Sequence, residues 1–228
     1  MENYDYIRKN LEELSLEIRE YEEKYSRSIT LVCVTKSGSD EELLALCEAG
    51  ARDIGENRPG ELRRRGELLS ERGLTPRLHE IGQLQRNKVK YIIDRVALIH
   101  SLDSEPLAAE IERQAVKVGR RVPVLIEINS GREASKGGIM PEEAEDFAKL
   151  LGSYPSLELS GLMTMGPVCE PEEARVYFRE TRELFDRMKS RGAFVGEGIL
   201  SMGMSDSYRV AIEEGSTLVR VGRALFRK

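Results

Sequence analysis

Short apolar segments alternate with helix-like segments along the chain, and this alternation limits the fold more than any other feature. Eight segments have the composition of β-strands. They span residues 29–34, 51–54, 77–81, 96–100, 123–128, 157–163, 198–202 and 217–221. The second and third are short and polar, so they carry the weakest signal. Strands separated by helices favour a parallel sheet, because parallel strands need a crossover connection.

Helix signals lie between these segments. Ser39 and Glu42 have the spacing of a capping box, and Gly50 is expected to end the helix that they begin. Pro141 is expected to begin a helix that runs to residue 152, and Ser205 one that ends near residue 215. Residues 6–25 form a further amphipathic pattern, which is expected to cover the outside of the sheet rather than to bind a partner.

Eight such units allow either a closed barrel or a large open sheet. The barrel is favoured because the units fill all 228 residues, within the usual ~200 to 400 for that fold. No GxGxxG motif follows the first strand, which argues against a dinucleotide-binding sheet. We therefore predict an α/β chain with a single (β/α)8 TIM-barrel domain over residues 1–228, in which residues 1–27 form an extra N-terminal helix.

Composition narrows the partners and the compartment. A net charge of -5 and a pI near 5.4 argue against nucleic acid. The run Arg63-Arg64-Arg65 lies among acidic residues and is interpreted as a solvated helix face. No segment reaches the ~20 apolar residues of a membrane span, and the N-terminus lacks the pattern of a leader. The three cysteines form no metal or disulfide pattern, which favours the cytoplasm.

Lys36 follows the strongly apolar first strand, and active groups of such barrels collect at the carboxyl ends of the strands. Burial at that position would favour the neutral amine that imine formation with an aldehyde requires. The alternative is a lysine whose charged end simply reaches water. Position alone does not choose between them.

The loops after the seventh and eighth strands have the composition of a phosphate site. Gly203 and Gly222 would let backbone N–H groups approach an anion, while Ser201 and Ser205 supply hydroxyls near a helix start. Tight turns with a capping serine would explain Gly203 and Ser205 equally well, but explain their combination with Gly222 less well.

Histidine and metal chemistry are restricted, because only His79 and His100 are present. No GxSxG or HExxH motif occurs, so neither a serine hydrolase nor a metal site is expected. Both histidines are interpreted as hydrogen-bonded residues of the barrel wall.

Eight ordered motifs resemble those of the YggS/PROSC family, the pyridoxal phosphate homeostasis proteins. They are VCVTKS (32–37), GEN (55–57), HEIGQLQRNK (79–88), HSLDS (100–104), INSGREASKGG (128–138), GLMTM (161–165), LSMGMSDSYRVAIEEGST (200–217) and VRVGRALF (219–226). The resemblance runs from about residue 30 to the C-terminus, and the co-occurrence of the motifs makes it specific.

The resemblance implies a fold-type III barrel that binds pyridoxal 5′-phosphate, similar to the N-terminal domain of alanine racemase. It implies that Lys36 holds the cofactor as a Schiff base and that Arg220 faces the pyridine nitrogen. It also places Ser201, Gly222 and Arg223 at the phosphate, the last two through main-chain N–H groups. Asn57 and Met163 would line the cofactor.

The chain departs from the family pattern at several positions. Arg223 replaces a residue that is often small or hydroxylated, and its side chain would either add a charged contact or fold outward. Glu80 replaces a residue that is often aromatic, and Gly60 stands where the family usually has glutamine.

Two functions follow from the resemblance. The first is a non-enzymatic carrier, expected to be a cytoplasmic monomer, that buffers pyridoxal 5′-phosphate and delivers it to apo-enzymes. The second is an amino-acid racemase with weak or specialised activity. The carrier is favoured because such racemases use a second domain and a tyrosine that faces the lysine, and no tyrosine of this chain is expected at a strand end. A third interpretation is a barrel for another phosphorylated metabolite, with Lys36 as a plain cation.

Overall fold

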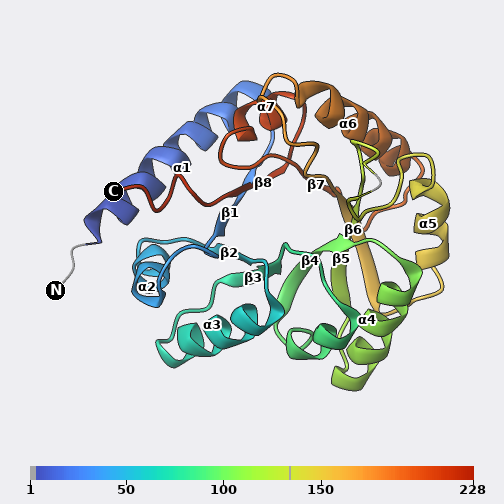
Figure 1. Cartoon of the computed structure of the whole chain (residues 1–228), viewed down its shortest axis with the longest axis horizontal. Coiled ribbons are helices and arrows are strands. Elements are labelled where there is room, and N and C mark those ends of the chain that lie inside the picture. Colours follow the sequence, from blue (N-terminus) through green and yellow to red (C-terminus); the bar gives the residue numbers. More distant parts are fainter. Residues whose placement is uncertain (1–3, 134) are drawn as a thin grey trace.

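A computed structural model describes residues 4–133 and 135–228, and its strands close into a parallel barrel in sequence order (Figure 1). The strands are β1 (Thr30–Val34), β2 (Asp53–Glu56), β3 (Arg77–Glu80), β4 (Val96–Leu102), β5 (Val122–Glu127), β6 (Leu157–Met163), β7 (Ile199–Ser201) and β8 (Leu218–Val221). All eight predicted strands are confirmed. The second begins at Asp53 rather than Ala51, because the Ala51 N–H bonds back to Leu46 O at the end of the preceding helix.

Helices cover the outside of the barrel. They are α1 (Asp5–Tyr25), α2 (Asp40–Glu48), α3 (Pro59–Glu71), α4 (Glu105–Val118), α5 (Ala144–Leu151), α6 (Arg175–Ser190) and α7 (Tyr208–Glu213), with a 3-10 helix, η1 (Arg86–Tyr91), after β3. The capping box of Ser39 and Glu42 is present at α2. The predicted starts of α5 and α7 were too early. The chain first makes i to i+3 turns there, with Glu143 N–H donating to Met140 O and Ser207 N–H to Met204 O.

The apolar core has two parts. A small cluster fills the inside of the barrel and consists of Val32, Leu98, Leu125, Met163 and Leu218. A much larger layer lies between the strands and the helices. The rest of the barrel interior carries polar side chains, and these belong to the site described below.

The N-terminal helix α1 packs on the barrel and spans Asp5–Tyr25 of the predicted 1–27, of which residues 1–3 lie outside the described part of the chain. Its buried face consists of Ile7, Leu11, Leu14 and Ile18, which recur at helical spacing. Tyr6 donates a hydrogen bond to Glu42 of α2, and Tyr208 of α7 donates one to Glu17 (2.8 Å). The helix therefore lies between α2 and α7 in the outer ring (Figure 1).

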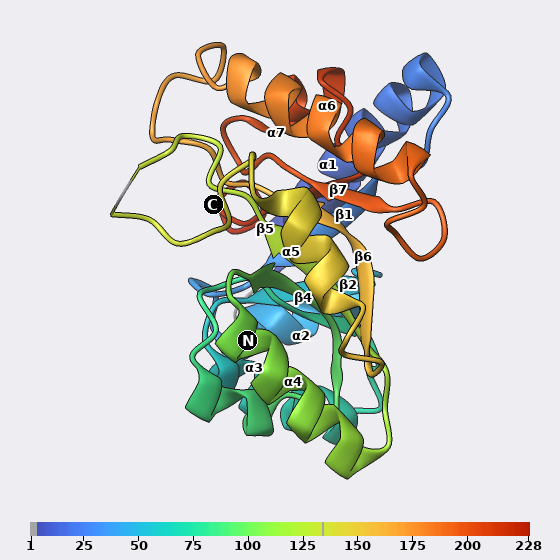
Figure 2. The same ribbon diagram turned by 90° about the vertical axis from the view of Figure 1, so that its right-hand side faces the viewer.

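The long loops after β5 and β6 extend to the same side of the molecule, as the turned view shows (Figure 2). This is the side on which parallel strands place their carboxyl ends, and on which barrels of this type build their sites. Among the helices that the structure describes, none is long and apolar enough to cross a membrane.

Candidate functional site

Lys36 lies in a tight turn directly after β1. The Gly38 N–H donates to Thr35 O across the turn (2.9 Å). Thr35 and Gly38 are buried, whereas the side chain of Lys36 is exposed. Of the two alternatives that position left open for this lysine, the structure has the one that reaches water, because the turn carries residue 36 out of the apolar strand to the rim of the barrel.

The loop after β8 lies beside this turn. Strand β1 pairs with β8, so that Val32 lies opposite Arg220 and Cys33 opposite Val221. A Cβ at Gly222 would lie 2.9 Å from Val34 O, so glycine allows the two backbones to come this close. The sequence-predicted lysine and the sequence-predicted glycine thus come together at one edge of the mouth.

Two backbone N–H groups converge on a single oxygen in this loop. The N–H groups of Gly222 and Arg223 both donate to Ser205 Oγ, at 3.2 Å and 3.1 Å. Converging main-chain N–H groups form a concavity that suits a phosphate oxygen. The Arg223 side chain is exposed and pairs with Asp206, so of the two alternatives for this residue the structure has the outward one.

Arg220 occupies the barrel interior below this loop and is 4% exposed. Its Nη1 donates to Ser201 O (3.0 Å) and to Ser201 Oγ, and its Nη2 donates to Thr164 O (3.0 Å). Burial lowers the pKa of Arg220 to about 10, while the charge of Glu127 opposes that shift. The guanidinium therefore stays charged at neutral pH and is held in one orientation.

Ser201 lies with Arg220 rather than with the Gly222 and Arg223 N–H groups. Its hydroxyl is fully buried and contacts His100 Nδ1 at 3.0 Å. Ser205 is the hydroxyl that meets the N–H pair. The sequence showed both serines near a helix start, but only the tertiary structure distinguishes their surroundings.

A buried chain of hydrogen bonds continues from Ser201 across the barrel. His100 Nε2 lies 3.0 Å from His79 Nδ1, and His79 Nε2 lies 2.8 Å from Asp53 Oδ1. Although burial opposes it, hydrogen bonds from His79 and Arg77 hold the pKa of Asp53 below its ordinary value. Burial, with the nearby His79 and Arg220, lowers the pKa of His100 well below its ordinary value.

Asp53 accepts the His79 Nε2–H, because a carboxylate has no hydrogen of its own to donate. Ser201 Oγ accepts a hydrogen bond from Arg220 Nη1, and the same hydroxyl contacts His100 Nδ1. The two histidines and Ser201 therefore connect Asp53 to Arg220. The prediction that both histidines are hydrogen-bonded wall residues is confirmed, and they also support Arg220.

Asn57 and Met163 lie at the ends of two further strands. Asn57 directly follows β2 and is partly exposed, and a Cβ at Gly82 would lie 2.3 Å from Asn57 O. Met163 ends β6 and is 1% exposed within the inner apolar cluster. Both therefore stand at the carboxyl side of the barrel.

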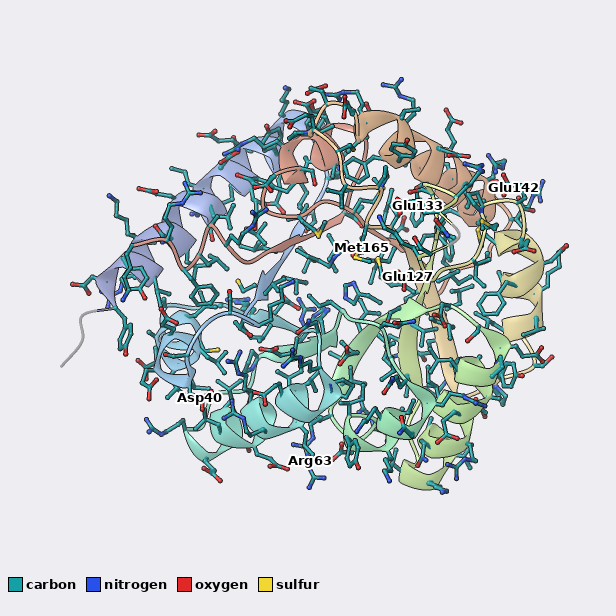
Figure 3. All side chains as sticks on the ribbon, in the orientation of Figure 1. Asp40, Arg63, Glu127, Glu133, Glu142 and Met165 are labelled. Atoms are coloured by element: carbon teal, nitrogen blue, oxygen red, sulfur yellow. The ribbon has the colours of Figure 1, made fainter. Side chains whose placement is uncertain are left out.

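The sequence did not single out Glu127, which ends β5. In Figure 3 it lies near the centre of the ring with Met165, whereas Asp40 and Arg63 lie on the outer helices. Burial, and then the charge of Asp103, raises the pKa of Glu127 to about 7. A carboxyl group at a strand end of such a barrel was the signal that could have identified it.

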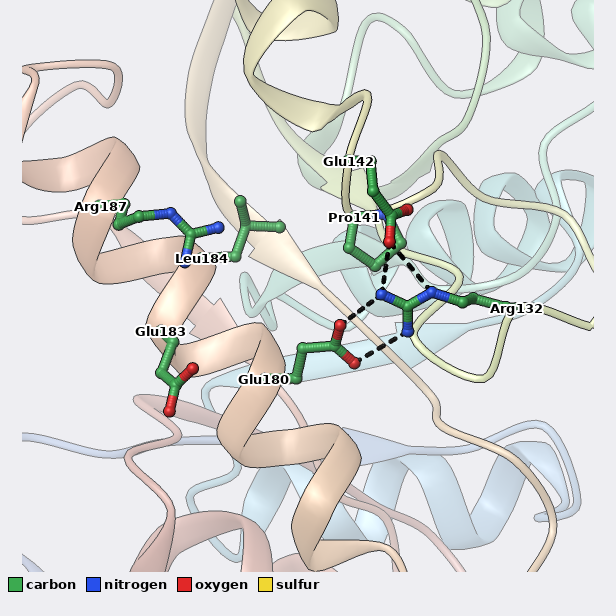
Figure 4. A pocket seen from close by; sticks show the side chains of 7 residues that line it. All are labelled: Arg132, Pro141, Glu142, Glu180, Glu183, Leu184 and Arg187. Carbon is green, nitrogen blue, oxygen red and sulfur yellow. Dashed lines mark hydrogen bonds and ion pairs between the residues drawn. The ribbon is translucent and has the colours of Figure 1, made fainter.

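A groove outside the barrel does not belong to this site. It lies between the loop after β5 and α6, and the side chain of Arg132 crosses it to Glu142 and Glu180 (Figure 4). The charge of Arg132 is therefore already paired with the two glutamates that line the groove. In residues 4–133 and 135–228, no group of three or more His, Cys, Asp or Glu side chains is placed to hold a metal ion.

Comparison with known proteins identifies the family. Residues 9–227 match the alanine racemase N-terminal domain. The chain is 43% identical over 197 residues to the pyridoxal phosphate homeostasis protein of Aquifex aeolicus, covering 86% of this chain and 85% of that one. It is 35% identical over 229 residues to the protein of the same name from Helicobacter pylori strain 26695, covering 98% of this chain and 99% of that one.

Solved structures agree with this assignment. PipY of Synechococcus elongatus with pyridoxal phosphate bound has a TM-score of 0.84 and 25% identity, covering 97% of this chain and 100% of PipY. An alanine racemase of Clostridium difficile shares the fold, with a TM-score of 0.75 and 20% identity, but this chain covers only 56% of it. The chain therefore belongs to the alanine racemase N-terminal domain family and, within it, to the pyridoxal phosphate homeostasis proteins.

Proposed function

We propose that this protein binds pyridoxal 5′-phosphate through Lys36 and acts as a carrier of the cofactor rather than as an enzyme. The observation that carries the proposal is the adjacency of three groups at one edge of the barrel. Arg220 lies on β8, the Gly222 and Arg223 N–H groups follow that strand, and the Lys36 turn follows its neighbour β1. An aldehyde, a phosphate and a pyridine nitrogen are the three features of this cofactor that such groups fit.

Each residue has a distinct part in the proposal. Lys36 would hold the cofactor through its amine, which would bond to the aldehyde carbon with loss of water. The Gly222 and Arg223 N–H groups would hold the phosphate. Ser201 contributes indirectly, because its hydroxyl accepts a hydrogen bond that orients Arg220. Asn57 and Met163 line the ring. The cofactor supplies an aldehyde and an aromatic ring that accepts electrons.

Arg220 favours storage over catalysis. Its charge is fixed by buried hydrogen bonds, and a cation beside the ring nitrogen disfavours protonation of that nitrogen. An unprotonated ring is a weaker electron acceptor, which limits the stabilisation of a carbanion. Racemases that share this barrel also use an arginine there, so the position of the tyrosines matters equally.

The tyrosines give the second support for a carrier. Those in the described part of the chain lie in helices, at the residue before α1 (Tyr4) or in the turn at Tyr154, and Tyr208 donates its hydroxyl hydrogen to Glu17 of α1. None of the described tyrosines directly follows a strand. We further propose that the protein acts in the cytoplasm and supplies apo-enzymes. We also propose that it is a monomer, since every strand pairs within the chain and leaves no open sheet edge for a second copy.

The first test is spectroscopic. The protein incubated with pyridoxal 5′-phosphate is expected to turn yellow, and borohydride should fix the mass of the cofactor on Lys36 by peptide mass spectrometry. Lys36→Ala should stay colourless, whereas Lys149→Ala, an exposed lysine of α5, should behave as the wild type. A wild type that remains colourless would overturn the assignment.

A second test separates the carrier from an enzyme. The loaded protein is incubated with a panel of amino acids, and chirality and keto-acid formation are followed. Little or no turnover is expected, and loss of the cofactor to an added apo-enzyme should be faster than any conversion. Rapid racemisation or transamination of one amino acid would show that the protein is an enzyme.

A further inference from the structure

Arg65 contradicts the interpretation of the Arg63-Arg64-Arg65 run as a solvated face. Arg63 and Arg64 are exposed on α3, but Arg65 is 6% exposed. Its guanidinium reaches inward from the helix layer to the turn that carries Lys36. A buried arginine is costly unless its donors are satisfied, so its partners indicate why it is there.

The guanidinium holds both ends of the Lys36 turn. Nη1 donates to Thr35 O (2.6 Å) and Nη2 donates to Gly38 O (2.6 Å). These carbonyls belong to the residues that flank Lys36 and Ser37, which are themselves exposed. A planar fork with fixed geometry can bind two acceptors at once in this way.

Glu56 holds the guanidinium and the turn together. Its Oε1 accepts hydrogen bonds from Arg65 Nη1 and from Thr35 Oγ1, and its side chain is 2% exposed. Glu56 ends β2, which pairs with β1. The opposite charges of Arg65 and Glu56 compensate each other, so the pair ties the turn to the barrel without leaving a net charge beneath it.

We infer that Arg65, oriented by Glu56, is a positioning residue that holds the Lys36 turn in the geometry needed for the lysine amine to bond to an aldehyde. This inference rests on the proposed function, because it concerns the same lysine. It assigns to the outer helix α3 a part in cofactor capture, although Arg65 itself does not reach the mouth.

The test compares two ligands that share the ring and phosphate. Pyridoxal 5′-phosphate can bond to Lys36, whereas pyridoxine 5′-phosphate carries an alcohol in place of the aldehyde and cannot. Arg65→Met should slow formation of the yellow adduct by about tenfold to a hundredfold, the range expected when a reacting group is misplaced by about 1 Å. Binding of the alcohol, measured by calorimetry, should stay within about twofold, since no bond to Lys36 is involved.

Hydrogen exchange gives a readout that is independent of the cofactor. In Arg65→Met without ligand, the amide of Gly38 should exchange faster, because the turn loses the donor that holds its two carbonyls. Arg64→Met is the matched control. Arg64 precedes Arg65 on the same helix but pairs with Asp40 and Glu61 outside, so adduct formation and exchange should match the wild type.

A second variant guards against misfolding, because Arg65→Met alone leaves Glu56 buried without its cation. The double variant Arg65→Met/Glu56→Gln removes both charges and should show the same split between aldehyde and alcohol. Equal weakening of both ligands, or unchanged adduct formation in the folded variants, would overturn the role of Arg65. A wild type that binds the alcohol but forms no adduct would instead refute the proposed function.

Discussion

At the scale of single residues, Glu80 has an unusual environment for a carboxyl group. It ends β3 and is fully buried. One oxygen accepts the Gly82 N–H (3.1 Å), and the other has no hydrogen-bond partner among the described residues. Burial raises the pKa of Glu80 to about 8, opposed by the Gly82 hydrogen bond and assisted by the charge of Glu56.

This shift predicts a pH-dependent stability. The folded chain keeps the Glu80 proton up to about pH 8, whereas an unfolded glutamate loses it near about 4.3, so the folded state binds more protons between these values. Stability should therefore fall as pH rises through that window. Glu80→Gln should remove part of the fall, on the order of a few kcal/mol at about 1.4 kcal/mol per pKa unit.

Urea unfolding at several pH values between about 5 and about 9 measures this effect. The difference in unfolding free energy between Glu80→Gln and wild type should grow in favour of the variant as pH rises. Glu71→Gln, an exposed glutamate of α3, serves as the control and should give a constant difference. Parallel curves for Glu80→Gln and wild type would show that the carboxyl group ionises as in the unfolded chain.

At the scale of elements, β6 depends on one glycine. Gly161 has a φ of 149°, and a Cβ there would lie 1.9 Å from Ile199 O of β7. Because the contact is with backbone, no side-chain rotation relieves it. Strand β6 pairs with β7 from Gly161 to Met163. The next residue, Thr164, has the carbonyl oxygen that accepts a hydrogen bond from Arg220.

Gly161→Ala is therefore expected to destabilise the barrel by about 3 kcal/mol or more, at the upper end of overpacking effects. Gly60→Ala is the matched control, because Gly60 lies in α3 and a Cβ added there would meet nothing within 4 Å. That substitution should be neutral or stabilising by up to about 1 kcal/mol. Chemical denaturation of both variants tests the contrast, and equal effects would contradict it.

At the scale of the whole molecule, α1 connects the first and the last βα units of the barrel. It contacts α2 through Tyr6 and α7 through Glu17, and Asn10 donates to Leu225 O (3.1 Å). These contacts span the seam where β1 pairs with β8. Since Lys36, Gly222 and Arg220 lie on or directly after those two strands, the helix supports the part of the barrel wall that carries the proposed site.

Leu14→Ala should show how much this helix contributes. Leu14 is 6% exposed against the barrel, and truncation of a buried leucine costs about 2–5 kcal/mol. Leu16 lies on the same helix but is 56% exposed, so Leu16→Ala should stay within about 0.5 kcal/mol of wild type. Comparable losses in urea unfolding would mean that α1 does not pack as described.

Much of this architecture was predictable from local chemistry. The eight strands, the capping box at Ser39 and the amphipathic face of α1 depend on residues close in sequence, and the structure confirms them. The exact starts of α5 and α7 could not be predicted, because a first turn with i to i+3 bonds has the same capping residues as an α-helix.

The site shows the same division. Lys36 and Gly222 could be selected from the sequence because both follow strands of a predicted barrel, and motif order related the chain to a family. The pairing of Ser201 with Arg220 and the contact of Arg65 with the Lys36 turn involve residues far apart in the chain. Sequence alone determined which groups are present at the strand ends. Only closure of the barrel decided which of them touch, because β1 meets β8 and α3 reaches the Lys36 turn only in three dimensions.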